Sequence, residues 1–106
     1  MRLWDAANKL PANLGHGHYF EPDESGGWLP CCVVGHLIVL AGGDASMEAS
    51  TQFPLLVAMY GLRAFQWEAL ISANDDTGDE WRQLVVLREI SKIVVGAMRQ
   101  RELLGN

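Results

Sequence analysis

The sequence predicts a mostly α-helical (α+β) fold in which four to five helices surround a central apolar helix at residues 31–41, with a small β-ribbon near residues 16–29. Two observations support this prediction. Apolar residues fill residues 31–41 and recur at helical spacing over residues 78–103. Residues 16–29 instead combine aromatic residues with turn-forming ones, which is typical of a hairpin. At 106 residues the chain has the size of one domain, and we expect a single domain spanning residues 1–106.

The first predicted elements are a short helix and the ribbon. Apolar residues recur at helical spacing over residues 2–10, and Pro11 limits how far that helix extends. The segment GHGHYF, residues 15–20, favours a strand through its two aromatic residues. The cluster PDESGG that follows is typical of a turn, and Trp28 and Leu29 then supply a returning strand. Because an isolated two-stranded ribbon is only marginally stable, we expect it to pack against helices.

Three further helices follow from apolar runs and the residues that bound them. Pro30 suits the first turn of a helix over residues 31–41, and the Gly42-Gly43 pair ends it. Because this run is almost wholly apolar, we expect the helix to be central. Residues 55–60 predict a helix opened by Pro54 and ended by Gly61. Residues 63–73 predict another, with three residues facing inward: Phe65, Ala69 and Leu70.

The last helix carries the clearest local signal. Thr77 and Glu80 match the capping box, which predicts a helix from about Gly78 to Leu103. Its pattern places one apolar stripe inward: Trp81, Leu84, Leu87, Ile90, Val94 and Met98. Other apolar residues widen this stripe beyond the seam of a coiled coil. A helix of this kind crosses the domain or pairs with a second copy. We expect a homodimer through residues 78–103 whose contacts include Val86, Ile93 and Val95.

The distribution of charge and the two cysteines indicate which kinds of partner and which cellular compartment to expect. The formal net charge is −5, and no Lys or Arg lies between Lys9 and Arg63, which opposes binding to phosphate backbones. No apolar run reaches the roughly 18 to 20 residues needed to span a bilayer, and no apolar leader follows the N-terminus. Cys31 and Cys32 are adjacent, so a bridge between them could not stabilise a fold, and we expect reduced thiols. We therefore expect a cytoplasmic protein without nucleic-acid or membrane partners.

All three histidines and both cysteines fall between residues 16 and 36, and this segment has three interpretations. The first is a zinc site. His16 and His18 would share one face of a strand, while Cys32 and His36, four residues apart, would share one face of a helix. Those four side chains could complete a tetrahedral zinc site, although the chain has no CxxC pair.

The second interpretation is catalytic. A thiol in the first turn of a helix is stabilised as thiolate, so Cys31 or Cys32 with a histidine base would act as a thiol-dependent hydrolase. The third interpretation is packing, in which glycines let the ribbon approach the helix and His36 lies in the core. We favour the third interpretation and expect no cofactor, with zinc as the alternative.

The favoured function is binding without catalysis. Exposed tryptophan is typical of binding faces. Candidate contact residues are Trp4, Trp28 and Trp67, together with the dimer contacts named above, whereas we assign Trp81 to the core. These features predict a small accessory protein whose partner is another protein.

Two stretches carry a family resemblance, GHGHYF…GGWLPCCVVGHLIVLAGG and YGLRAFQWEALISANDDTGDEW. They resemble a group of small proteins of unknown function from actinobacteria and their phages. The resemblance covers about residues 4 to 95, and seven positions match its pattern: Gly17, Tyr19, Cys32, Gly35, His36, Asn74 and Asp75. It implies an α-rich fold and a phage or mobile-element setting, and it implies no activity.

Overall fold

The computed structural model describes residues 1–104 and confirms the predicted fold, with five α-helices, one 3-10 helix (η1) and a two-stranded antiparallel sheet in that range. In chain order the elements are α1 Leu3–Ala7, β1 Phe20–Pro22, β2 Trp28–Pro30, α2 Val33–Leu40, η1 Ala49–Gln52, α3 Phe53–Tyr60, α4 Ala64–Asp75 and α5 Arg82–Leu103.

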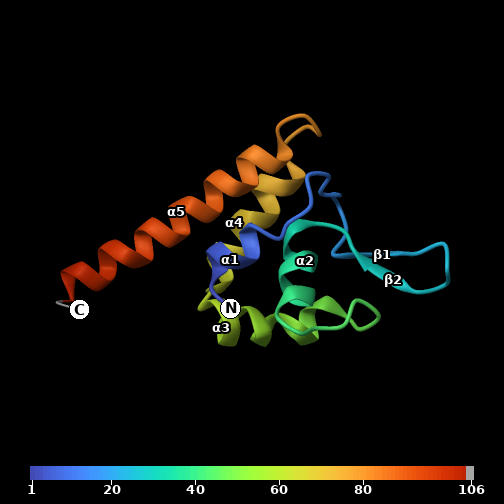
Figure 1. Cartoon of the computed structure of the whole chain (residues 1–106), viewed down its shortest axis with the longest axis horizontal. Helices are drawn as coiled ribbons and strands as arrows, with labels where there is room; N and C mark the ends of the chain where they lie inside the picture. Colours follow the sequence, from blue (N-terminus) through green and yellow to red (C-terminus); the bar gives the residue numbers. More distant parts are fainter. Residues whose placement is uncertain (105–106) are drawn as a thin grey trace.

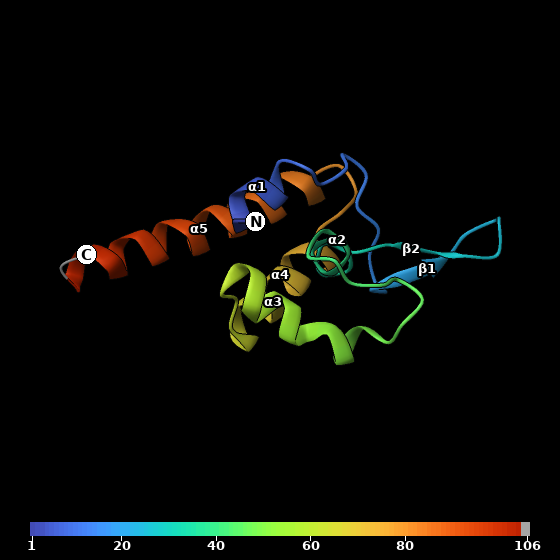
Figure 2. The ribbon, with the colours of Figure 1, turned by 60° about the horizontal axis from the view of Figure 1, so that its bottom comes forward.

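The elements form an elongated molecule with α2 near its middle (Figure 1). The longest dimension is 51 Å, and the β1–β2 ribbon and the C-terminal end of α5 lie at its opposite ends. Helix α4 contacts both α2 and α5, while α1 packs on α5. Both views show the second half of α5 extending beyond the other helices (Figures 1 and 2). In the described residues, no helix is both long enough and apolar enough to cross a bilayer.

The core is centred on α2, as its composition predicts. Four of its side chains are fully buried: Val33, Val34, Leu37 and Ile38. They meet fully buried residues of the surrounding helices: Leu56, Leu70, Val86 and Ile90. Complete burial of a branched aliphatic side chain contributes about 1.5–3 kcal/mol. The apolar run at residues 31–41 therefore forms the centre of the domain.

The predicted helix ends at glycine and the predicted helix start at Pro54 are confirmed. Gly42 follows α2 with φ 94° and Gly61 follows α3 with φ 67°, so both glycines take the left-handed conformation that commonly ends helices. A proline occupies the first turn of α3, where its missing N–H would be unpaired in any case. The predicted helix start at Pro30 is wrong, because Pro30 lies in β2 and α2 begins only at Val33.

The ribbon packs against α2 through a glycine, as the packing interpretation predicts. Phe20 pairs with Pro30, and the Cys31 N–H donates to the Tyr19 carbonyl at 2.8 Å. A Cβ atom on Gly35 would overlap that same Tyr19 carbonyl. Only glycine at this position allows the ribbon to lie so close to the helix.

The predicted capping box is wrong. Helix α5 begins at Arg82, and no side chain caps its N-terminus within the described residues. The Thr77 hydroxyl instead donates to the Ala73 carbonyl at 2.8 Å, at the end of α4. This bond holds the Thr77 side chain against the last turn of α4, five residues before α5 begins.

The predicted inward stripe of α5 is wrong at three positions. Trp81, Leu84 and Met98 are exposed by 60%, 60% and 56%, so Trp81 also does not belong to the core. The buried face is formed by Arg82, Val86 and Ile90. The first four residues of the predicted stripe recur every three residues and the last two every four. The stripe therefore drifts around a helix of about 3.6 residues per turn, and its two ends leave the face that packs on the core.

Phe65 also departs from its predicted inward position, because 63% of it is exposed. It lies at the second residue of α4, whereas Leu70, five residues later, is fully buried. Helical spacing alone does not show which turn of a helix has a neighbour, and the first turn of α4 lies at the edge of the core.

Candidate functional site

The histidines do not occupy the strand face that the sequence predicts. His16 and His18 are exposed and precede β1, which begins at Phe20. His36 lies half-buried within α2, where burial lowers its pKa and nearby Glu21 acts in the opposite direction. In residues 1–104, no group of three or more His, Cys, Asp or Glu side chains is placed to hold a metal ion. The predicted zinc ligands are therefore not gathered into one site.

Both thiols are buried, and burial favours their protonated form. Burial raises the pKa of Cys32 to about 11, although the nearby N–H groups of Val34 and Gly35 lower it. Burial also raises the pKa of Cys31, and the carboxylate of Glu21 adds to that shift. A nucleophilic cysteine needs the opposite shift, because thiolate is the reactive form. The structure therefore favours packing as the role of both cysteines.

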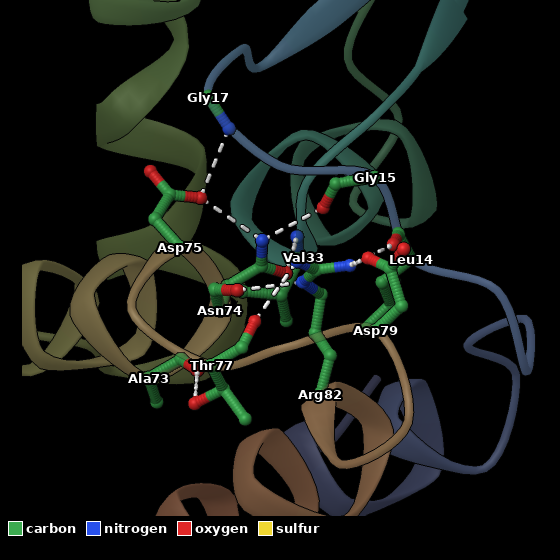
Figure 3. A network of polar contacts seen from close by, with 10 residues as sticks. All are labelled: Leu14, Gly15, Gly17, Val33, Ala73, Asn74, Asp75, Thr77, Asp79 and Arg82. Carbon is green, nitrogen blue, oxygen red and sulfur yellow. Dashed lines mark hydrogen bonds and ion pairs between the residues drawn. The ribbon is translucent and has the colours of Figure 1, made fainter.

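Asn74 is the centre of a buried polar junction between α4, α2 and the segment before the ribbon (Figure 3). Its side chain has no exposed surface. The Oδ1 atom accepts a hydrogen bond from the Val33 N–H at 3.0 Å, and the Nδ2 group donates to the Gly15 carbonyl at 2.7 Å. Asn74 thus satisfies one of the N–H groups that a helix leaves unpaired in its first turn.

Arg82 completes this junction from the start of α5 and is 5% exposed. Its guanidinium donates to three backbone carbonyls and to one carboxylate (Figure 3). The carbonyls belong to Leu14, Asn74 and Thr77, at 3.3, 2.7 and 2.9 Å. The carboxylate is that of Asp79, and Arg82 lowers its pKa. The planar fork of arginine suits such convergent acceptors. Sequence reasoning missed this role, because nothing distinguishes Arg82 from the surface arginines of the same helix.

A small pocket opens beside the junction, lined by Gly17, His18, Tyr19, Cys32, Ile71 and Asp75. Its volume of about 120 Å³ is well below that of typical small-molecule sites. An Asp75 carboxylate oxygen accepts hydrogen bonds from the Gly17 N–H at 3.1 Å and from Asn74 at 3.0 Å. The junction therefore brings together most of the positions that carry the family resemblance, and their observed contacts are structural.

The four tryptophans lie in different surroundings. Trp67 is half-buried and packs on Phe53, with ring centroids 5.3 Å apart, so it belongs to the edge of the core. Trp4 and Trp28 are exposed by 45% and 50%. Of the proposed dimer contacts, Val86 is fully buried and cannot contribute to a surface, while Val95 is 44% exposed.

Trp28 is part of a larger exposed apolar surface that we name the ribbon–loop surface, defined by Trp28, Leu29 and Met47. These side chains are exposed by 50%, 46% and 53%. One groove runs between the ribbon and residues 45–49, with Tyr19 and Phe20 in its lining. A second groove runs along β2 and residues 42–46. Sequence analysis named only Trp28 among these three residues, since contact between the loop and the ribbon depends on the tertiary fold.

The free edges of the ribbon are poor templates for a further strand. The Asp23 N–H donates to the Gly27 carbonyl at one end of the sheet, and the Cys31 N–H donates to the Tyr19 carbonyl at the other. Hydrogen-bonded and non-hydrogen-bonded pairs alternate along an antiparallel ribbon, so Pro22 and Pro30 fall at non-hydrogen-bonded positions, where the backbone nitrogen faces the outer edge. Proline has no N–H with which an added strand could pair, so these prolines oppose the addition of a third strand to the ribbon. Contacts of the ribbon with a partner would therefore run through side chains.

Comparison with known proteins finds no family model, no curated protein and no solved structure that matches the chain. The resemblance to small actinobacterial and phage proteins stays a prediction.

Proposed function

We propose that this protein acts without catalysis, as an accessory protein that binds another protein through the ribbon–loop surface. The observation that supports this proposal best is the exposure of Trp28 and Met47 beside the same groove. Large apolar side chains at the margin of a groove are typical of the anchors that dominate protein interfaces. An exposed cluster of this kind marks an interaction surface more often than an isolated exposed residue does.

The charge around this surface indicates the chemistry of the partner. Glu21, Glu24, Asp44 and Glu48 are all exposed on the ribbon and the neighbouring loop. The chain offers no Lys or Arg between residues 9 and 63. Complementary potentials steer encounter and select partners. The partner segment therefore carries lysine or arginine next to an apolar residue that enters the groove.

The state of the thiols supports a role without catalysis. Cys32 has a pKa of about 11, so at neutral pH it is a neutral core residue. We place the protein in the cytoplasm, where such thiols stay reduced. The motif pattern leads us to propose a phage-encoded origin, with a host or phage protein as the partner.

Selection from a random peptide library on the immobilised protein tests the proposal. We expect the retained peptides to combine basic residues with an aromatic or large aliphatic residue. Their binding should fall at least tenfold in a Trp28→Ala, Met47→Ser double variant. Peptides without a basic bias, or peptides that bind this variant equally well, would contradict the proposed surface. A Phe65→Ser variant is the control, because it removes an even more exposed apolar residue elsewhere.

A further inference from the structure

Helix α5 carries a second apolar stripe on the side that faces away from the core. We name it the outer stripe and define it by Trp81, which directly precedes the helix, and by Leu84, Val95 and Met98. These side chains are exposed by 60%, 60%, 44% and 56%. Together with Arg88, Ser91 and Glu102 they follow the alternating three- and four-residue spacing of a coiled-coil seam.

The two faces of α5 differ in burial within the described residues. The inner face buries Val86 and Ile90 completely against the core. The outer stripe is exposed, and part of it lies on the half of the helix that extends beyond the domain (Figure 1). Exposed apolar residues aligned along one face of a helix are typical of a surface that another chain covers.

The charges at the two ends of α5 differ in sign, which favours antiparallel pairing with a second copy of the same helix. Exposed acidic residues, Asp76 and Glu80, precede its N-terminal end. Near its C-terminal end lie Arg99 and Arg101, both exposed, with Glu102 as the one acidic neighbour in that turn. When two copies pair antiparallel, the acidic end of each meets the basic end of the other. A parallel pair would bring like charges together.

We propose that a second copy of this chain covers the outer stripe, with the two α5 helices antiparallel. This pairing replaces the predicted contact at Val86 by contacts of Trp81, Leu84, Val95 and Met98. The 22 residues of α5 span about 33 Å. Exposed stripe residues along this length bury on the order of 1,000 Å² over two copies, which reaches the lower range of specific interfaces. The proposal does not depend on the ribbon–loop surface.

The mass in solution is the first test. Light scattering at micromolar concentration should give twice the chain mass of 11.7 kDa. A Leu84→Glu, Val95→Glu double variant should give 11.7 kDa with an unchanged circular dichroism spectrum, because both residues are exposed in the single chain. The Phe65→Glu variant should remain dimeric. A monomeric wild type would overturn the proposal, and a dimer that survives the double substitution would overturn the location of the interface.

Cross-linking then tests the direction of the helices. Both native cysteines are buried, so cysteines introduced on α5 are the reactive ones. In an antiparallel pair, Leu84→Cys in one copy lies near Met98→Cys in the other. Mild oxidation should therefore link a mixture of the two variants and leave each variant alone unlinked. Efficient linking of each variant with itself would show a parallel pair and contradict the proposal.

Discussion

The side-chain amide of Asn74 joins α4 to the first turn of α2 by accepting a hydrogen bond from the Val33 N–H at 3.0 Å. The same amide donates to the Gly15 carbonyl at 2.7 Å, so one buried residue fixes two segments that are distant in the sequence. The amide therefore ties α4 to the central helix and to the segment that leads into the ribbon.

Replacement of Asn74 by alanine should destabilise the fold strongly. It would leave the Val33 N–H and the Gly15 carbonyl without their side-chain partner in a buried place, and each unsatisfied group costs about 1–3 kcal/mol. We expect the free energy of unfolding in urea to fall by about 3 kcal/mol. The exposed neighbour Asp76 is the control, and Asp76→Ala should change stability little. Equal stability of the two variants would show that the junction is not essential.

Replacement of Arg82 even by lysine should lower the stability of the fold. Lysine keeps the charge of Arg82 but cannot reach three carbonyls with a planar fork, so Arg82→Lys should cost about 2 kcal/mol. Arg88 is exposed on the same helix, and Arg88→Lys should be neutral within about 0.5 kcal/mol. Chemical unfolding of the two variants gives the comparison. A loss at Arg88 as large as that at Arg82 would remove the special role of the buried guanidinium.

Two glycines in helices should respond to alanine with opposite signs. At Gly35 a Cβ atom would overlap the Tyr19 carbonyl, so Gly35→Ala should destabilise by about 1–3 kcal/mol. At Gly96 an added Cβ meets open space, so Gly96→Ala should stabilise α5 by about 0.5–1 kcal/mol. Thermal unfolding of both variants checks the signs. A tolerated Gly35→Ala would show that the ribbon does not rest on α2 at this point.

Stability should decrease between about pH 9 and pH 11 because of Cys32. The thiol of the unfolded chain loses its proton near the ordinary cysteine pKa of 9.0, whereas the folded thiol keeps its proton up to a pKa of about 11. The folded state therefore binds more protons in this window, and the free energy of unfolding falls as the pH rises, by on the order of 2 kcal/mol. Urea unfolding of wild type and Cys32→Ala at about pH 8 and about pH 10.5 measures the difference. A wild-type loss no larger than that of the variant would contradict the burial of this thiol.

Local sequence signals predicted the elements of the fold well. The central helix, the ribbon and the glycine stops follow from composition within a few residues, and the structure confirms them. The capping box failed because the Thr77 hydroxyl bonds to Ala73, a choice that depends on where α4 ends. The inward face of α5 also could not be read from periodicity, since apolar residues occur on two sides of this helix.

The candidate surfaces were harder to predict than the elements. Trp28 was identified from its residue type, but Met47 lies beside the same groove only because residues 45–49 fold back against the ribbon. The buried role of Arg82 similarly depends on how the chain folds, because its guanidinium meets the carbonyl of Leu14, far away in the sequence, together with those of Asn74 and Thr77 in the preceding turn. Such sites are assembled by tertiary contacts, which a single sequence does not encode as a local pattern.

The central claim is that an acidic, aromatic surface on the ribbon binds a basic partner segment. Its most direct test is the affinity of one selected peptide, labelled with a fluorophore, for wild type and for a Glu21→Lys, Glu48→Lys double variant. Both glutamates are exposed, so the variant should fold normally. The account predicts that charge reversal weakens binding at least tenfold and that added salt weakens binding to the wild type. Equal affinity for both proteins, unaffected by salt, would contradict it.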